Sequence, residues 1–141
     1  MLALAITVFS IYTYAADTTV SQKVLDAFTK AFPAAESPNW SELGDFFEVS
    51  FKQGTITSKV TYDKDANVIK TMRSYSQENL PIMILAKVMN KYGDKKINGV
   101  TEECSEEGVN YYITLEDDKN WTEVKSDSIG NLSVQKKYKK G

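Results

Sequence analysis

The chain has 141 residues, enough for one compact domain with a sizeable core. Its 17 basic and 19 acidic residues give a net charge of −2 and are scattered among each other, which argues against nucleic acid as the main partner. The sequence has no histidine, so the commonest general base, the Ser–His and Cys–His nucleophile pairs and most zinc or copper sites are missing. We therefore do not expect an enzyme, and we expect no cofactor.

The first residues predict export. An apolar stretch at positions 2–14 precedes the small residues Ala15 and Ala16, and it is shorter than the roughly 20 apolar residues of a transmembrane helix. This pattern predicts a signal peptide over residues 1–16, although no basic residue precedes the apolar stretch, and the alternative is an uncleaved anchor. We expect the mature protein, residues 17–141, to be a periplasmic or secreted monomer without stable membrane insertion.

A first helix is predicted after the leader. Thr19 and Gln22 have the spacing of a capping box, and Pro33 ends the helical pattern. The predicted helix has one apolar face, formed by Val24, Leu25, Phe28 and Phe32.

A strand meander follows the first helix. Between positions 46 and 62, apolar and polar residues alternate in two runs, which is typical of strands with one buried and one solvated face. Gln53-Gly54 and the segment 63–67 supply turn residues between the strands.

The second half of the chain has the same order. Asn79-Leu80-Pro81 predicts a helix start, and Gly93 predicts its left-handed end. Apolar residues cover more of this helix than of the first, so we expect it to be the more deeply buried one. A strand over 97–104 and a second meander from Val109 complete the pattern.

The two meanders share one register. Phe47 and Tyr111, Asp63 and Asp127, and Asn67 and Asn131 are each 64 positions apart, which predicts a tandem duplication with repeats over about 17–76 and 77–141. The expected fold class is α+β: a helix-plus-four-strand unit written twice, with both helices packed on one face of an antiparallel sheet and the other face in solvent.

These motifs resemble the PepSY-like family of exported bacterial proteins, also described as β-lactamase-inhibitor-like. The resemblance covers nearly all of the chain after the leader and is carried by Ala31-Phe32-Pro33, Trp40, Phe46-Phe47-Glu48-Val49, Asp63-Lys64-Asp65-Ala66-Asn67, Asn79-Leu80-Pro81 and Tyr111-Tyr112-Ile113. It implies a periplasmic or surface-exposed α+β protein with two repeats and no catalysis. The residues with which β-lactamase inhibitors plug an active site have no counterpart that can be located in this chain, so the resemblance assigns no inhibitory residue.

Aromatic residues on the solvated side of the strands are the candidate binding residues. The alternation places Phe46, Tyr112 and Trp121 there, and Trp40 joins them if the first strand turns its polar face outward. Aromatic groups on an open sheet face are typical of protein–protein hot spots. The alternative is that strand twist or a helix covers them.

Other motifs have simpler interpretations. Asp63, Asp65 and Asn67 place oxygens at alternate positions, like the first half of a calcium loop, but Val68 stands where glycine is needed, and we favour a hairpin turn without metal. Cys104, the only cysteine, is flanked by glutamates that disfavour a reactive thiolate. The lysine-rich end, residues 136–140, is interpreted as a solvated tail rather than a polyanion site.

The sequence thus favours a non-catalytic periplasmic protein-binding module, whose partner is an exported protein and which inhibits or regulates an exported enzyme. The alternative is an envelope protein that binds a small ligand or an ion between sheet and helices. Aromatics on one open face would favour a protein partner, and aromatics lining an enclosed pocket would favour a ligand.

The leader generates the first prediction. Because the apolar stretch ends at Ala15 and Ala16, we expect the mature protein to begin at Ala16 or Asp17 and to fractionate with soluble periplasmic material. N-terminal sequencing checks this, and a membrane-bound product that still begins at Met1 would show that the segment is an anchor.

Overall fold

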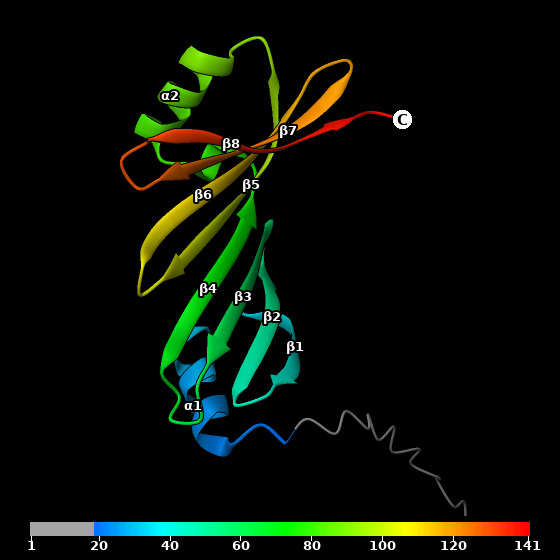
Figure 1. Cartoon of the computed structure of the whole chain (residues 1–141). Coiled ribbons are helices and arrows are strands. Elements are labelled where there is room, and N and C mark those ends of the chain that lie inside the picture. The colour runs from blue at the N-terminus through cyan, green and yellow to red at the C-terminus, as the bar shows by residue number, and fades with distance from the viewer. Residues whose placement is uncertain (1–18) are drawn as a thin grey trace, which may run out of the picture.

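The computed structural model describes residues 19–141, so the predicted leader lies outside the described part of the chain. All of its strands form one antiparallel sheet in chain order, from β1 at one edge to β8 at the other (Figure 1). The fold is therefore α+β, as predicted. The elements are α1 (Gln22–Ala31), β1 (Glu36–Leu43), β2 (Phe46–Gln53), β3 (Ile56–Tyr62), β4 (Val68–Tyr75), the 3₁₀ turn η1 (Gln77–Asn79), α2 (Ile82–Tyr92), β5 (Lys96–Ser105), β6 (Gly108–Glu116), β7 (Asn120–Asp127) and β8 (Leu132–Lys139).

The predicted alternation of the meanders is confirmed. In β2, Phe47, Val49 and Phe51 are buried while the residues between them are at least partly exposed. Val49 pairs with Val60 on β3, so the buried side chains of neighbouring strands lie opposite each other, as cross-strand pairs must. Gly54, with a φ of +60°, makes the turn between β2 and β3.

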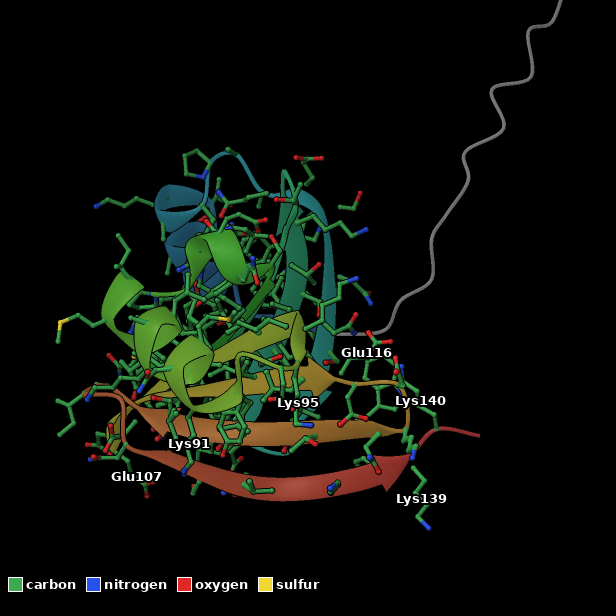
Figure 2. All side chains as sticks on the ribbon, turned by 90° about the horizontal axis from the view of Figure 1, so that it is seen from above. Lys91, Lys95, Glu107, Glu116, Lys139 and Lys140 are labelled. Carbon is green, nitrogen blue, oxygen red and sulfur yellow. The ribbon has the colours of Figure 1, made fainter. Side chains whose placement is uncertain are left out.

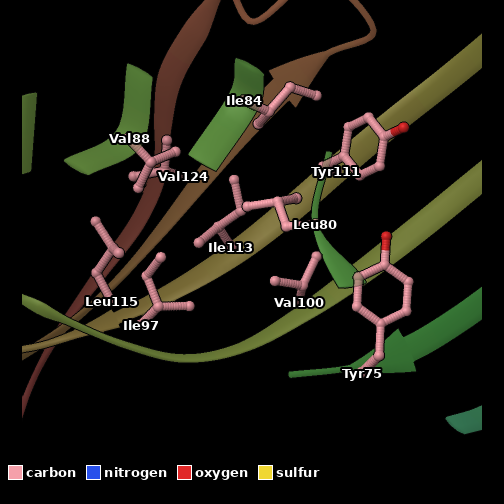
Figure 3. Packing of buried hydrophobic residues seen from close by; sticks show 10 residues of the cluster. All are labelled: Tyr75, Leu80, Ile84, Val88, Ile97, Val100, Tyr111, Ile113, Leu115 and Val124. Carbon is pink, nitrogen blue, oxygen red and sulfur yellow. The ribbon is translucent and has the colours of Figure 1, made fainter. Parts of the chain in front are cut away.

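Each half of the sheet has its own core. The first contains Val24 and Phe28 of α1 with Phe47, Val49, Phe51, Val60 and Tyr62 of the strands. The second packs Ile84 and Val88 of α2 on β4–β7 (Figure 3); its buried members are Tyr75, Leu80, Ile84, Val88, Ile97, Val100, Tyr111, Ile113, Leu115 and Val124.

Both helices lie on the same face of the sheet. The cross-strand pairs Val60–Thr71, Thr71–Cys104 and Cys104–Val109 lead from the first core to the second. Because directly paired side chains point to one face, both cores share that face, and Figure 2 shows α1 and α2 on one side of the strands. Neither helix of residues 19–141 lies on the opposite face.

The two halves share a turn conformation at the predicted offset. Asp63 accepts hydrogen bonds from the backbone and side-chain amides of Asn67, at 2.9 and 2.8 Å. Asp127 accepts the same pair from Asn131, at 2.9 and 2.7 Å. Ala66 and Gly130, before the two asparagines, both have positive φ. The halves are thus alike in detail, and their origin by duplication stays a prediction.

The predicted helix ends are wrong in two respects. The N-cap of α1 is Ser21 and not Thr19, since the Ser21 hydroxyl accepts the Val24 N–H at 3.4 Å and the helix begins only at Gln22. Gly93 after α2 is right-handed, with a φ of −65°. A Cβ there would lie 2.6 Å from the Met89 carbonyl oxygen, so close backbone approach explains the glycine.

The expectation that the second helix is more deeply buried is also wrong. Only Ile84 and Val88 are buried in α2, the same number as in α1. The additional apolar residues of α2, Ile82 and Met83, are 84% and 73% exposed. One helix stripe is all that contact with a single sheet face can bury, so Ile82 and Met83 face outward.

Both ends of the sheet differ from the sequence interpretation. Residues 37–40, which lie before the alternating run at positions 46–62, belong to strand β1. The lysine-rich end is not a solvated tail, because residues 136–139 form the second half of strand β8. Among residues 19–141, no helix is both long and apolar enough to cross a membrane.

Two neighbouring isoleucines in α2 test the assignment of the helix faces. We expect Ile84→Ala, at a side chain that is 2% exposed, to lower the free energy of unfolding by about 2–5 kcal/mol, because it leaves a cavity against the sheet. Ile82→Ala, the matched control, should change it by less than about 0.5 kcal/mol. Urea denaturation measures both, and equal losses would contradict the assigned faces.

Candidate functional site: the open face of the sheet

The sheet face opposite the helices is called the open face here. Successive side chains of a strand point to opposite faces, so the open face is formed by the residues that alternate with the buried ones. The pairing of the strands shows which of these residues lie next to each other. Across β2–β7 its members include Phe46, Glu48, Ser50, Lys52, Thr57, Lys59, Thr61, Lys70, Met72, Ser74, Thr101, Glu103, Ser105, Asn110, Tyr112, Thr114, Glu116, Trp121, Glu123 and Lys125.

Ion pairs between neighbouring strands neutralise much of the charge on the open face. Lys59 lies 2.9 Å from Glu48, and Lys70 lies 2.6 Å from Glu103. Each pair is partly exposed, so its contribution to stability is about 0–1 kcal/mol. Their effect is to pair two of the lysines on β3 and β4 with glutamates of the neighbouring strands.

The second half carries three aromatic rings on the open face, and lysine ammonium groups lie over two of them. Tyr112 lies opposite Lys125, whose ammonium is 5.7 Å from the ring centre. Trp121 lies opposite Tyr138, and the Lys140 ammonium is 4.8 Å from the Trp121 ring centre. These five residues are called the aromatic cluster.

The rings of the cluster are held in place. Lys140 also pairs with Glu116 at 2.5 Å, which fixes its ammonium over Trp121. A cation over an aromatic ring contributes about 0.5–1 kcal/mol at an exposed site. Tyr112 and Trp121 are half-buried by these neighbours, so binding would restrict their rotation little.

Phe46 shares the face but not the cluster. It is 41% exposed, beside the 50% exposed Leu43 on the other side of the β1–β2 turn. Phe46 begins β2, while Trp121 is near the start of the antiparallel β7, so the two lie at opposite ends of strands that are five positions apart in the sheet. At about 4.8 Å for each step between strands, this separation exceeds 20 Å. Tyr112 and Trp121 lie on neighbouring strands but about 13 Å apart along them, because Tyr112 pairs with Lys125 and Trp121 pairs with Glu116. The structure therefore places these two rings on the same half of the face and leaves Phe46 apart.

Trp40 does not lie on the open face. It pairs with the fully buried Val49, and its ring packs edge-on against Phe28 at 5.3 Å and near Tyr62 at 6.2 Å. The tight β1–β2 turn after Leu43 sets this register, so Trp40 contacts the first core and covers α1. Gly44, whose φ is +61°, marks this turn in the sequence. Counting strand positions back from Gly44 would have placed Trp40 on the helix side.

The calcium-like turn uses its oxygens internally. One Asp63 oxygen accepts the N–H groups of Asp65 and Asn67, at 2.8 and 2.9 Å, and the other accepts the Asn67 side chain. These hydrogen bonds, first the one from the Asn67 side chain, lower the pKa of Asp63. The turn is thus an Asx turn, as interpreted from the sequence, and within residues 19–141 no cluster of metal-ligating side chains is found.

A polar group links β4 to β5 on the helix side of the sheet. The Tyr75 hydroxyl donates to Glu102 at 2.6 Å, and Arg73 lies 3.5 Å from the same carboxylate. Burial, followed by the hydrogen bond to Glu102, raises the pKa of Tyr75 above its usual value. Tyr75 therefore stays protonated at neutral pH, so it acts as a donor that ties β4 to β5 and not as a general base.

Beside this group lies a shallow hollow of about 510 Å³, between the β3–β4 and β5–β6 turns. Val68 and Ile69 supply apolar surface, and Thr71 and the partly exposed Cys104 form its floor. None of the predicted aromatic residues lines it. It is the place that a small ligand would use under the alternative interpretation.

An apolar surface on α2 is not predicted from the sequence. Ile82 and Met83 are exposed, as is Ile129 (66%) in the β7–β8 turn. The Lys87 ammonium donates to the Ile129 carbonyl at 2.7 Å and so joins turn and helix. Apolar residues outside the buried stripe of the helix were the available signal.

Solved structures share this fold, whereas no protein-family model and no curated protein matches the sequence. A BLIP-like protein of Bacteroides fragilis superposes with a TM-score of 0.66 at 23% identity, covering 86% of this chain and 88% of that one. A candidate periplasmic protein of Bacteroides eggerthii gives 0.66 at 15% identity over 85% and 88%. A DUF2874 family protein of Bacteroides ovatus gives 0.65 at 16% identity over 86% and 88%.

At these identities the likeness shows the fold alone. The fold part of the predicted resemblance is confirmed, since the neighbours include a BLIP-like protein. The PepSY part stays a prediction.

Proposed function

We propose that this chain, on the fold that it shares with BLIP-like and candidate periplasmic proteins, is a non-catalytic, extracytoplasmic protein-binding module that binds through its open face. The observation that carries the proposal is the aromatic cluster on the sheet face opposite α1 and α2. Aromatic side chains that lose little freedom on binding are the usual centre of a protein interface.

The shape of the surface supports a protein partner over a small ligand. A small-molecule site encloses most of its ligand in a concave pocket, whereas Tyr112 and Trp121 stand on a sheet surface between ion-paired side chains. The hollow beside Cys104 does not include them, and the Asp63 oxygens at its rim are already bonded within their turn. The ligand-binding alternative therefore has the weaker support.

The non-catalytic part of the proposal rests on the chemistry of the residues present. The chain has no histidine, and carboxylates of the open face, Glu48, Glu103 and Glu116, are paired with lysines. Each of these carboxylates already faces a lysine ammonium, which leaves it poorly placed to exchange a proton with a substrate. Binding can then act by occlusion, and inhibition or regulation of an exported enzyme is the form of the function that we propose.

The arrangement of the aromatics refines the expected binding site. A standard interface covers about 800 Å² on each partner, so one centred on the aromatic cluster covers Tyr112 and Trp121 and reaches Phe46 only at its margin. We infer that the second half supplies the centre of the interface. We further propose that the protein acts as a periplasmic or secreted monomer.

The double variant Tyr112→Ser/Trp121→Ser tests this function. We expect each true hot spot to contribute at least about 2 kcal/mol, so each replacement should weaken binding by about 30-fold and the double variant should weaken it further. Residues 17–141 are immobilised, proteins captured from the cell envelope are identified by mass spectrometry, and the affinity of the recovered partner is measured for each variant.

Phe46→Ser, which removes an aromatic of the same face outside the cluster, is the matched control and should weaken binding less. The thermal unfolding of all variants should stay close to that of the wild type, because these side chains lie outside both cores. A folded double variant that binds its partner normally would contradict the proposal and favour the hollow beside Cys104. Unfolding of the double variant would show that the two rings belong to a core.

A further inference from the structure

The two edge strands of the sheet differ in how open they are to another strand. β1 carries Pro38, a Ser37 with a φ of +50°, and an irregular register between Glu36 and Asn39. Proline and bulges are the devices that block strand addition at an edge. β8 contains no proline, and after the irregularity opposite Glu123 and Val124 its residues pair regularly with β7.

The main-chain groups of β8 can be assigned to its two sides. The Lys140 N–H donates to the Lys119 carbonyl at 2.8 Å. Bonded and non-bonded residues alternate along an antiparallel pair, so Tyr138 and Lys136 also direct their N–H and C=O groups to β7. Those of Lys137 and Lys139 point to the free edge, where no described element pairs with them.

The side chains of this segment carry uncompensated positive charge. Within residues 19–141, Lys136, Lys137 and Lys139 form no ion pair, although Lys140 beside them pairs with Glu116. Figure 2 shows Lys139 projecting away from the outer strand. The edge therefore presents free main-chain groups and three free ammonium groups along four residues.

The lysines lie on both faces of the sheet. Lys136 is opposite Glu123, which belongs to the open face, and Lys137 is opposite the buried Thr122 on the helix side. A polyanion lying on one face would reach only some of them. A strand added at the edge directs alternate side chains to the two faces, so its acidic residues can reach all three.

We propose that the free edge of β8 binds an acidic, extended segment of another protein, which joins the sheet as a ninth strand next to Lys136–Lys139. Main-chain hydrogen bonds hold the strand, and the lysines select its acidic side chains. The same lysines repel the β8 edge of a second copy, which keeps the edge free. This site is the edge of the sheet and not its open face, so it does not rest on the function proposed above.

The probe is a fluorescent peptide of about eight residues, the length of β8, rich in Glu with Val and Thr. A counterpart with Lys in place of each Glu, and inorganic polyphosphate, serve as comparison ligands. Anisotropy at low salt gives the affinities, and NMR-detected hydrogen exchange follows the Lys137 and Lys139 amides. We expect the acidic peptide to bind and to slow exchange at these two amides, since they become hydrogen-bonded in the new ladder.

Two variants test the two parts of the site. Lys136→Gln/Lys137→Gln/Lys139→Gln keeps the main chain and should weaken peptide binding by about tenfold or more. Lys30→Gln/Lys52→Gln/Lys96→Gln makes the same change of net charge elsewhere and should bind nearly as the wild type does. Lys137→Pro removes an edge N–H without removing a bond to β7, and should abolish binding. If Lys137→Pro fails to fold, the glutamine variants decide alone.

The outcomes that overturn the proposal are distinct. Two results would identify a polyanion site. In the first, the peptide binds but hydrogen exchange at the Lys137 and Lys139 amides does not change. In the second, polyphosphate binds tightly and the glutamine variant loses polyphosphate and peptide binding together. Equal binding of the lysine peptide would show an unselective edge. Protection of the two amides at high protein concentration, without peptide, would show that a second copy occupies the edge.

Discussion

The pairing of β4 with β5 is the constraint on which the rest of the structure depends. It runs in register from Lys70–Ser105 to Tyr75–Val100 and joins two halves that otherwise have separate cores. Because side chains alternate across a strand, a shift of one residue here would move α2 to the other face of the sheet. The hydrogen bond from Tyr75 to Glu102 and the ion pair between Lys70 and Glu103 hold this register, one on each face. The open face exists because both helices lie on the side that this register gives them.

The same constraint explains where partners can reach the molecule. Both helices cover one face of the sheet, so the other face is in contact with water. This accounts for the ion-paired lysines and glutamates on that face. Aromatic rings tolerated on that face are therefore held by lysines and not buried in a core. The sheet does not close on itself, so it has two edge strands. Proline in β1 hinders the addition of another strand there, whereas β8 has lysine charges and no proline. The apolar surface of α2 around Ile82 has no explanation in these terms.

Much of this architecture could be predicted from strand periodicity, and the exceptions have physical reasons. Alternation around Phe47 and Tyr111 placed both meanders, because a half-buried strand shows its buried face in the sequence. Alternation cannot orient a short edge strand such as β1, so Trp40 was misplaced until its pairing with Val49 was known. It also cannot say how far apart two residues of one face lie, which is why Phe46 was grouped with Trp121. The lysines of β8 were interpreted as a tail, since an exposed edge strand has no buried face to give a pattern.

Hydroxyl-radical footprinting of the free protein, with residue-resolved mass spectrometry, tests most directly the claim that one face of the sheet is open. Two adjacent pairs of like residues serve as internal controls, because each pair has one member on each face. We expect Phe46, 41% exposed, to be oxidised much faster than Phe47, 7% exposed, and Tyr112 faster than Tyr111, which is 8% exposed. Equal or reversed rates within the pairs would show that the face is covered or that the register is shifted, and would contradict the account.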